Sequence, residues 1–156
     1  MKVIFKKLSE PEFANCHAST IFFENIYSKC FGVLCCDLNC FKFGWRSELI
    51  DPSIKKIEEN IFSLGIDQSF AIIDFTTNSV VFDLSLAYNF HDILNHKTHI
   101  AVCTEFEIIL INKDRYEVEE IIQLPDFFED GTIINDKIKI ICSDQTVVEK
   151  SISQKV

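Results

Sequence analysis

A β-hairpin pattern that recurs along the chain is the feature that most constrains the fold. Residues 70–84, "FAIIDFTTNSVVFDL", place two runs of β-forming residues on either side of a polar turn segment, "TTNS". The same pattern recurs more loosely as "FGVLCCDLNCFKFGW" at 31–45, "FEIILINKDRYEVEEIIQ" at 106–123 and "IKIICSDQTVVEKSI" at 138–152. A chain that repeats such hairpins can bury each copy against the next.

The repeat has a period of about 39 residues. Short apolar runs precede the hairpins, and aligning their isoleucines gives spacings of 40, 39 and 38 residues (Ile21, Ile61, Ile100 and Ile138). An acidic or proline-containing corner follows each of the first three hairpins and has room for one more short strand. An ordinary antiparallel meander, in which the similarity arises by chance, is the alternative interpretation.

The period divides the chain into units, each a small antiparallel meander of short strands. We predict at most one helical turn, near residues 53–59, and we expect "KVIF" at 2–5 to pair near a sheet edge. The predicted units are residues 20–59, 60–97, 98–136 and 137–152.

Two stretches, "FGVLCCDLNCFKFGWRSEL" and "SFAIIDFTTNSVVFDLSL", run from an apolar strand through an Asp and a turn to a second apolar strand. This arrangement resembles a β-propeller blade of the quinoprotein-like or WD40-like kind over most of residues 20–152, although the WD40 signature residues are absent. The resemblance implies an all-β fold of about three and a half blade-like antiparallel repeats. Because a closed propeller needs at least about four blades, we expect an open or sandwich-like β domain.

The length of 156 residues, without a linker or low-complexity segment, predicts a single domain over residues 1–156. We recognise no secretory signal near the N-terminus, and no stretch approaches the roughly 18 apolar residues of a membrane span. We therefore expect a cytoplasmic protein that does not bind membranes. The seven cysteines are then expected to be reduced thiols.

Two clusters suggest metal ligands, and we interpret neither as a metal site. The first cluster is formed by four closely spaced cysteines (Cys30, Cys35, Cys36 and Cys40). Cys35 and Cys36 are adjacent in a predicted strand, so they point to opposite faces and suit one zinc ion poorly. The second cluster is spread over two corners and a strand and need not converge (His91, His96, His99 and Cys103). We predict no metal and no cofactor.

The polar residues before the turns also have an ordinary explanation. Asp37, Asp74 and Asn112 precede predicted turns, where Asx side chains cap the backbone, and we prefer this interpretation to acid–base catalysis. We recognise no glycine-rich phosphate loop and no nucleophile elbow, so we predict that the protein is not an enzyme. Trp45 and Arg46 end a strand and mark either a binding hot spot or the sealed edge of a blade.

The charge balance points to a basic partner. The chain has 15 basic and 24 acidic residues, a net charge of −9, which disfavours direct nucleic-acid binding. Aromatic side chains stand among acids at 126–130, a combination suited to gripping a basic protein. The predicted partner-binding residues are Asp126, Phe127, Phe128, Glu129, Asp130, Glu105 and Glu107.

Small size, acidity and a lone β domain resemble in type the immunity proteins of bacterial contact-dependent inhibition or polymorphic toxin systems. That resemblance implies an antitoxin that masks the active site of a basic toxin domain, such as a nuclease. The alternative is a self-assembling propeller-like scaffold that completes its fold by oligomerisation. A monomer fits the first hypothesis and a dimer the second. An enzyme or small-molecule binder that uses the blade corners is a third, weaker hypothesis.

Overall fold

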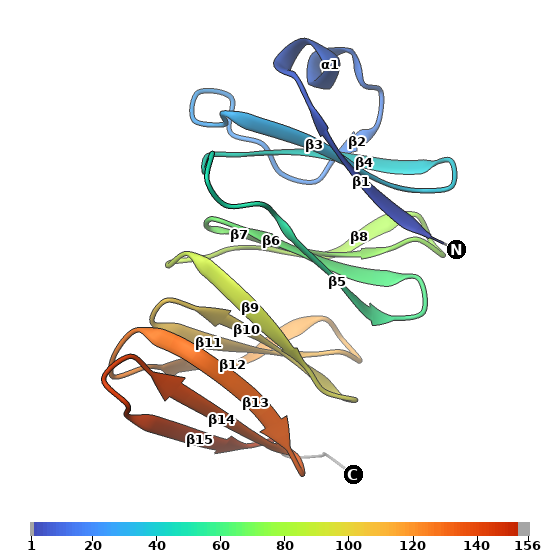
Figure 1. Ribbon diagram of the computed structural model, residues 1–156. Helices are drawn as coiled ribbons and strands as arrows, with labels where there is room; N and C mark the ends of the chain where they lie inside the picture. The colour runs from blue at the N-terminus through green and yellow to red at the C-terminus, as the bar shows by residue number, and fades with distance from the viewer. Residues whose placement is uncertain (1, 153–156) are drawn as a thin grey trace. The chain divides into compact units, whose positions relative to one another are not determined.

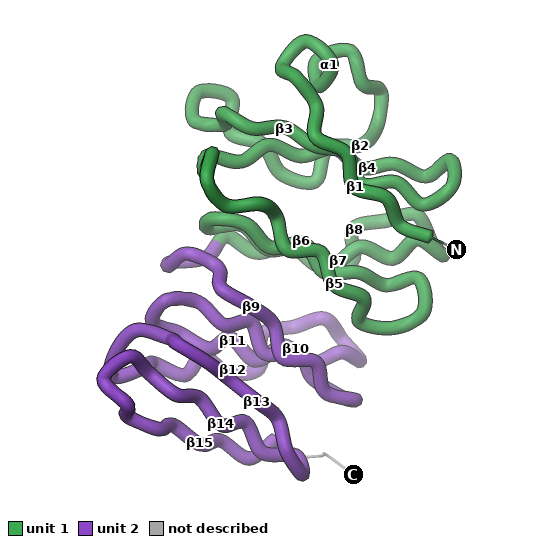
Figure 2. The backbone as a smooth tube through the Cα atoms, viewed as in Figure 1, with its two compact units in different colours: residues 1–85 green, residues 86–156 purple. Residues whose placement is uncertain are grey.

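The computed structural model describes residues 2–152, and these form one short helix and four sheets, which are antiparallel except for one two-residue strand (Figure 1). The chain divides into two compact units, residues 1–85 and residues 86–156 (Figure 2). Each unit contains two sheets, and the units are treated separately below. No helix in the described part of the chain is long and apolar enough to cross a membrane.

The first sheet of unit 1 combines two long central strands with an irregular fourth position. β1 (Val3–Leu8) pairs with β3 (Cys30–Cys36), which pairs with β4 (Asn39–Trp45). The fourth position is occupied by β2 (Ser19–Thr20), a two-residue strand that runs parallel to β4. The pairing of β1 at the sheet edge confirms the expectation for "KVIF".

The second sheet of unit 1 is a continuous meander of four antiparallel strands. It consists of β5 (Ser53–Glu58), β6 (Ile61–Ile66), β7 (Ser69–Asp74) and β8 (Ser79–Ser85). The predicted helical turn at 53–59 is wrong, because residues 53–58 form strand β5. Ile57 is buried next to the exposed Lys56, and the register of β5 shifts between Lys56 and Glu58, so a bulge interrupts the strict alternation of faces there.

Unit 2 holds one sheet of four strands and one of three. The first contains β9 (Phe90–Asn95), β10 (His99–Thr104), β11 (Glu107–Asn112) and β12 (Glu117–Gln123), paired in chain order. The second contains β13 (Phe128–Ile134), β14 (Lys137–Cys142) and β15 (Val147–Ser151). Together with the sheets of unit 1, they make the fold all-β with short antiparallel repeats, as predicted.

The sheets do not begin where the predicted units begin. The last three sheets start at residues 53, 90 and 128, one strand before the predicted starts at 60, 98 and 137. Ile61, Ile100 and Ile138 all lie in the second strand of their sheets, but Ile21 lies outside the strands, beside β2. In a meander every hairpin resembles the next. The sequence therefore predicts the length of the repeat but not the strand at which each sheet begins.

The same ambiguity affects the four hairpins that define the repeat. Residues 70–84 and 106–123 join the third and fourth strands of their sheets. Residues 31–45 and 138–152 instead join the second and third strands. The four segments are therefore two pairs of equivalent hairpins.

The single helix, α1 (Glu10–Asn15), was not predicted from the sequence. Ser9 caps it in a capping box: the Ser9 hydroxyl accepts from the Glu12 N–H at 3.2 Å and the Glu12 carboxylate accepts from the Ser9 N–H at 3.1 Å. At the other end, Lys42 Nζ donates to the carbonyls of Phe13 and Cys16. The sequence "SEPE" at 9–12 is the signal that identifies this helix.

The two units have cores of different composition. In unit 1, four of the eleven buried core residues are aromatic, and the fully buried Phe43 contacts the rings of Phe5, Phe22 and Trp45. In unit 2, the core is mainly aliphatic, built around Ile108, Leu110, Ile138 and Ile140. Among the described residues, the Trp45 indole N–H is the buried side-chain donor that lacks a hydrogen-bond partner.

Turns in this fold are made by residues other than glycine. Among residues 2–152, eight non-glycine residues have positive φ, including Asp37, Asn78, Tyr116 and Asn135, and none of the glycines does. All four glycines lie within strands. A Cβ at Gly32 would approach the Phe5 ring to 2.6 Å, so this glycine makes room for an aromatic side chain.

The structure corrects the prediction that all seven cysteines are reduced. Cys35 and Cys40 form a disulfide across the β3–β4 hairpin, and the other five cysteines are free. The two residues are directly opposite each other, with Cα atoms 4.1 Å apart, close to the separation of a non-hydrogen-bonded antiparallel pair. The prediction relied on compartment and overlooked that a four-residue turn segment brings these two thiols face to face.

Candidate functional site

Three connections of unit 2 meet at one end of its sheets and are joined by backbone hydrogen bonds. The Glu105 N–H donates to the Asn89 carbonyl at 3.1 Å, and the Phe128 N–H donates to the Glu105 carbonyl at 2.9 Å. The Leu124 N–H donates to the Phe106 carbonyl at 2.8 Å. These bonds hold the segment before β9, the β10–β11 turn and the β12–β13 loop in a fixed arrangement.

Aromatic rings form a row over these connections. Phe106 contacts Tyr88 on one side, with ring centroids 5.3 Å apart, and Phe127 on the other, at 4.9 Å. The His91 ring lies 6.0 Å from Phe127 and meets it edge-on. Phe127 is 38 % exposed, so this row is open to solvent where a partner can contact it.

Carboxylates surround the aromatic row. Glu105 and Asp126 are partly buried, and the Glu105 carboxylate accepts from the Asn89 N–H at 2.8 Å. Asp144 lies in the next turn, whose Ser143 N–H donates to the Phe127 carbonyl. We call this surface the acid–aromatic patch, and its residues are Tyr88, His91, Glu105, Phe106, Asp126, Phe127 and Asp144.

The patch carries negative charge at neutral pH. Hydrogen bonds from the Thr146 side chain and backbone N–H lower the pKa of Asp144, which keeps that carboxylate ionised. An ordered aromatic surface with ionised acids at its rim is suited to a cationic partner, since the rings supply contact area and the acids accept hydrogen bonds.

The structure brings together some of the predicted binding residues and separates others from the surface. Glu105, Asp126 and Phe127 meet in the patch, and Glu107 lies beside it with its carboxylate accepting from the Gln123 amide. Phe128 is only 7 % exposed and packs in the core of unit 2, so a partner can contact little of it.

Glu129 and Asp130 were also predicted as partner-binding residues, and they lie in strand β13. The strand bulges between Phe128 and Asp130, which leaves Glu129 without a partner in the register, and the Asp130 carboxylate accepts from the Gly131 N–H. Tyr88 and Phe106 were not predicted as part of the site. Phe106 directly follows Glu105 in a hairpin turn. Turns are usually built from polar residues, so an aromatic residue at this position was a signal that could have identified the site.

The histidines suspected of metal binding divide between two places. His91 belongs to the patch, whereas His96 and His99 are buried in a polar network of unit 2. Among residues 2–152 no group of three or more His, Cys, Asp or Glu side chains is arranged to hold a metal ion.

The buried network links two histidines through one threonine. His96 Nε2 is 2.6 Å from an Asp136 carboxylate oxygen, and His99 Nε2 contacts the Glu119 carboxylate. The Thr98 hydroxyl lies 3.0 Å from His96 Nδ1 and 2.7 Å from His99 Nδ1. The Thr98 backbone N–H also donates to His96 Nδ1, which therefore acts as an acceptor and leaves the ring proton on Nε2, facing Asp136. Each buried ring nitrogen has a partner, which is the arrangement of a structural network.

Asx residues act in turns, as predicted for two of the three positions. The Asp74 carboxylate accepts from the Thr76 N–H at 2.8 Å, and the Asn112 side-chain oxygen accepts from the Asp114 N–H at 2.8 Å. Asp37 instead occupies the left-handed region at a φ of 54°. Trp45 is 4 % exposed and packs against aromatic rings, while Arg46 pairs with Glu24 and lies over the Tyr27 ring.

No protein-family model and no curated protein matches this sequence. Among solved structures, Sqt1 from Saccharomyces cerevisiae is similar with a TM-score of 0.57 at 12 % identity, over 82 % of this chain and 43 % of Sqt1. Hydrazine synthase from Kuenenia stuttgartiensis has a TM-score of 0.50 at 14 % identity, over 64 % of this chain and 31 % of that chain. The WD40 domain of Pan2 from Neurospora crassa has a TM-score of 0.45 at 12 % identity, over 76 % of this chain and 43 % of that domain.

At these identities the likeness shows the fold alone. Similarity to Sqt1, together with the small antiparallel sheets, confirms partial propeller-type repeats. The chain spans less than half the length of the structures described above. The resemblance in type to immunity proteins, the absence of catalysis and the cytoplasmic location stay predictions.

Proposed function

We propose that the chain is a protein-binding module that holds a basic segment of its partner on the acid–aromatic patch. The observation that carries this proposal is the row of rings from Tyr88 through Phe106 to Phe127, set among Glu105, Asp126 and Asp144. The backbone hydrogen bonds between the connections order this surface before a partner arrives, which lowers the entropic cost of binding.

The negative charge of the chain favours a positively charged partner. A chain of net charge −9 attracts a basic protein over distances of about the Debye length, roughly 8 Å at physiological ionic strength, and speeds association. At the patch itself, carboxylates accept charge-assisted hydrogen bonds from Lys and Arg, and Phe127 offers a ring edge and face for their alkyl stems or guanidinium groups. On this proposal, the aromatic rings at the centre of the patch supply most of the binding affinity, and the acids raise the association rate.

An immunity factor for a basic toxin is the most specific form of this proposal. Carboxylates that face a nuclease cleft replace the phosphates of its substrate, so an acidic surface can mask the active site. The candidate toxin is the product of the gene that adjoins the gene of this protein. The immunity role is tested by the survival of cells that express this product together with the protein. Failure to bind or protect removes the immunity role and leaves the broader proposal to the peptide experiment below.

A peptide array tests the broader proposal. Peptides of varied sequence are probed with the protein at low and high salt, and basic peptides that contain Arg or aromatic residues are expected to bind best. The variant Phe127→Ala and the triple variant Glu105→Lys, Asp126→Lys, Asp144→Lys should lose this preference. The matched control reverses three acids outside the patch, Glu58, Asp114 and Glu117, and changes net charge equally. Equal loss in both triple variants contradicts the patch as the binding site.

Self-assembly is the second candidate, and sheet composition favours it. The sheet of β13, β14 and β15 has three strands, whereas the other sheets have four, and within residues 2–152 no strand pairs with the outer edge of β15. Val147 on that strand is 48 % exposed. An edge of this kind accepts a further strand. Sedimentation at rising concentration is the measurement: a dimer that Val147→Lys abolishes supports assembly, and a monomer at all concentrations removes it.

A further inference from the structure

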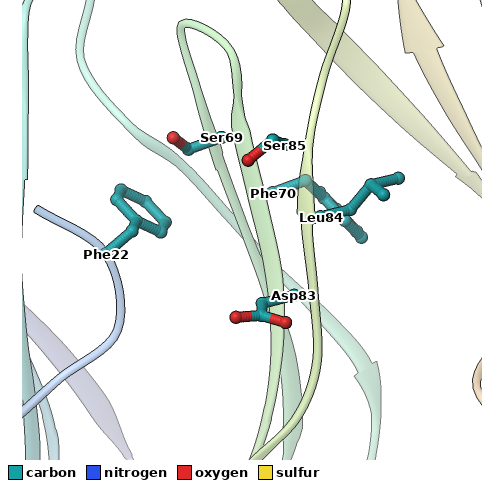
Figure 3. A pocket seen from close by; sticks show the side chains of 6 residues that line it. All are labelled: Phe22, Ser69, Phe70, Asp83, Leu84 and Ser85. Carbon is teal, nitrogen blue, oxygen red and sulfur yellow. The ribbon is translucent and has the colours of Figure 1, made fainter.

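A hollow in unit 1 collects polar side chains that have no other role. Its volume is about 270 Å³, and it is lined by Phe22, Ser69, Phe70, Asp83, Leu84 and Ser85. Figure 3 shows Ser69, Ser85 and Asp83 on the side of the sheet that faces the Phe22 ring, while Phe70 and Leu84 point away. The hollow therefore has an aromatic wall opposite a polar one.

Strand register explains why these residues meet. Ser69 on β7 is directly opposite Ser85 on β8, and Asp83 is opposite Ala71. Residues two apart in a strand share a face, so two serines, an alanine and one aspartate form a patch of small side chains beside a single carboxylate. The small side chains leave the space that the hollow occupies.

Phe22 is held in place from outside the hollow. Its ring contacts the fully buried Phe43 ring with centroids 5.6 Å apart, and its carbonyl accepts from the Gly44 N–H at 3.0 Å. These contacts fix the aromatic wall relative to β4. The Phe22 ring is therefore already held in place before a ligand binds.

The polar wall is available to a ligand. In the described part of the chain, no hydrogen bond or ion pair reaches the side chains of Ser69, Asp83 or Ser85. The wall offers a carboxylate and two hydroxyls, all of which can accept hydrogen bonds, and its only formal charge is negative. A ligand that matches it carries several N–H donors and a positive charge.

We propose that this hollow binds the guanidinium group of an arginine side chain from a protein partner. A guanidinium presents donors in a planar fork that matches a carboxylate, and it stacks on aromatic rings more often than an ammonium does. The volume is below the range of about 300–1,000 Å³ that is typical of small-molecule sites, so one side chain fits the space better than a larger ligand. The site lies in unit 1 and does not depend on the acid–aromatic patch of unit 2.

Binding of blocked arginine, followed by NMR chemical shifts, tests the site. N-acetyl-arginine methylamide is titrated into the full chain, and shifts are expected at Ser69, Asp83 and Ser85. Blocked lysine should bind more weakly, and blocked citrulline, which has the same shape without the charge, should not bind. Citrulline binding as tightly as arginine, or lysine binding more tightly, overturns the proposal.

Variants of the two walls separate this site from other acids. Asp83→Asn is expected to weaken binding of blocked arginine by about tenfold, and Phe22→Leu by about threefold. Asp114→Asn, which changes the charge equally in unit 2, should have no effect. Unchanged binding to Asp83→Asn contradicts the proposal.

Free arginine distinguishes the source of the guanidinium. Tighter binding of the free amino acid than of the blocked form shows that the ligand is a metabolite and overturns the assignment to a protein side chain. Loss of the patch in the Phe127→Ala variant should leave these titrations unchanged, so failure of the proposed function and failure of this site are separate results.

Discussion

Units 1 and 2 each pack two small antiparallel sheets, but they stabilise them with different chemistry. Unit 1 has a core with several aromatic rings among its aliphatic residues, and a disulfide across its β3–β4 hairpin. Unit 2 has a mainly aliphatic core and a buried network of two histidines, a threonine and two carboxylates. The difference shows that the strand pattern specifies the sheets, while the means of holding them together is free to vary between copies.

The largest effect is expected from the aromatic core of unit 1. Phe43→Ala removes a fully buried ring and should lower the free energy of unfolding by about 3–5 kcal/mol. In unit 2, the smaller change Ile140→Val should cost about 0.5–1.5 kcal/mol. Urea unfolding provides both values, with Trp45 fluorescence as the probe in unit 1. Ile26→Ala, at a site 85 % exposed, is the control, and a similar loss there contradicts the aromatic core as the main support of unit 1.

Removal of the disulfide should have the next largest effect. Cys35 and Cys40 are five residues apart, and closing so short a loop stabilises a fold by about 2 kcal/mol in the chain-entropy description. Cys35→Ser with Cys40→Ser should lower the urea midpoint by the corresponding amount. Thiol counting on the denatured, unreduced protein is the direct check: five reactive thiols are expected, and seven would restore the original prediction of fully reduced cysteines.

The histidine network of unit 2 should show a smaller, cooperative effect. A double-mutant cycle of His99→Ala and Glu119→Ala is expected to give a coupling energy of about 1 kcal/mol, because the buried ring and the carboxylate contact each other. Chemical unfolding of the four proteins measures it. Glu117→Ala, an exposed acid on the same strand, serves as the control in a second cycle with His99. Equal coupling in both cycles would show that the network does not act through this contact.

The capping box of α1 should give the smallest effect, visible in its pH dependence. Hydrogen bonds from the Ser9 backbone N–H and from its side chain lower the pKa of Glu12 below the ordinary 4.5. The folded-state pKa is depressed, so this stabilisation is present above the ordinary pKa and is lost as pH falls through the lowered value.

Glu12→Gln separates the charge of the capping residue from its shape. Melting temperatures of this variant and the natural protein should differ at pH 7 and converge as the pH is lowered toward 3. Glu48→Gln, an exposed acid outside the helix, should show no such convergence. A difference that stays constant with pH would show that the charge of Glu12 is not part of the cap.

The fold class was predictable because it depends on patterns that act over short distances. Apolar runs such as "FAIID" and "EIILI" became buried central strands β7 and β11. The period was also readable, and Ile61, Ile100 and Ile138 occupy equivalent strands. The strand at which each sheet begins was not predictable, because the hairpins of a meander have similar composition. In the first sheet, the fourth position is taken by β2, and the strand near residue 53 belongs to the next sheet.

Parts of the candidate site were predictable for the same reason and others were not. Asp126 and Phe127 were recognisable as acids and aromatics in a corner, and Glu105 was placed one strand away. Their contact with Tyr88 and His91 depends on how three connections of unit 2 converge, and no local sequence pattern predicts that convergence. The hollow beside Phe22 needs contact between residues almost fifty positions apart, and the sequence carries no signal for it.

The placement of the glycines has a consequence for how this chain can change under mutation. Turns use Asp, Asn, Tyr and Gln at positive φ, so several residue types, glycine included, can replace them without loss of the fold. The strand glycines are the opposite, since a Cβ at Gly32 or Gly131 would overlap a neighbouring side chain within 3 Å. Over generations of drift, the turns are expected to diverge while these two positions stay glycine. A search for distant relatives would do best to align on the strand glycines and not on the hairpin turns.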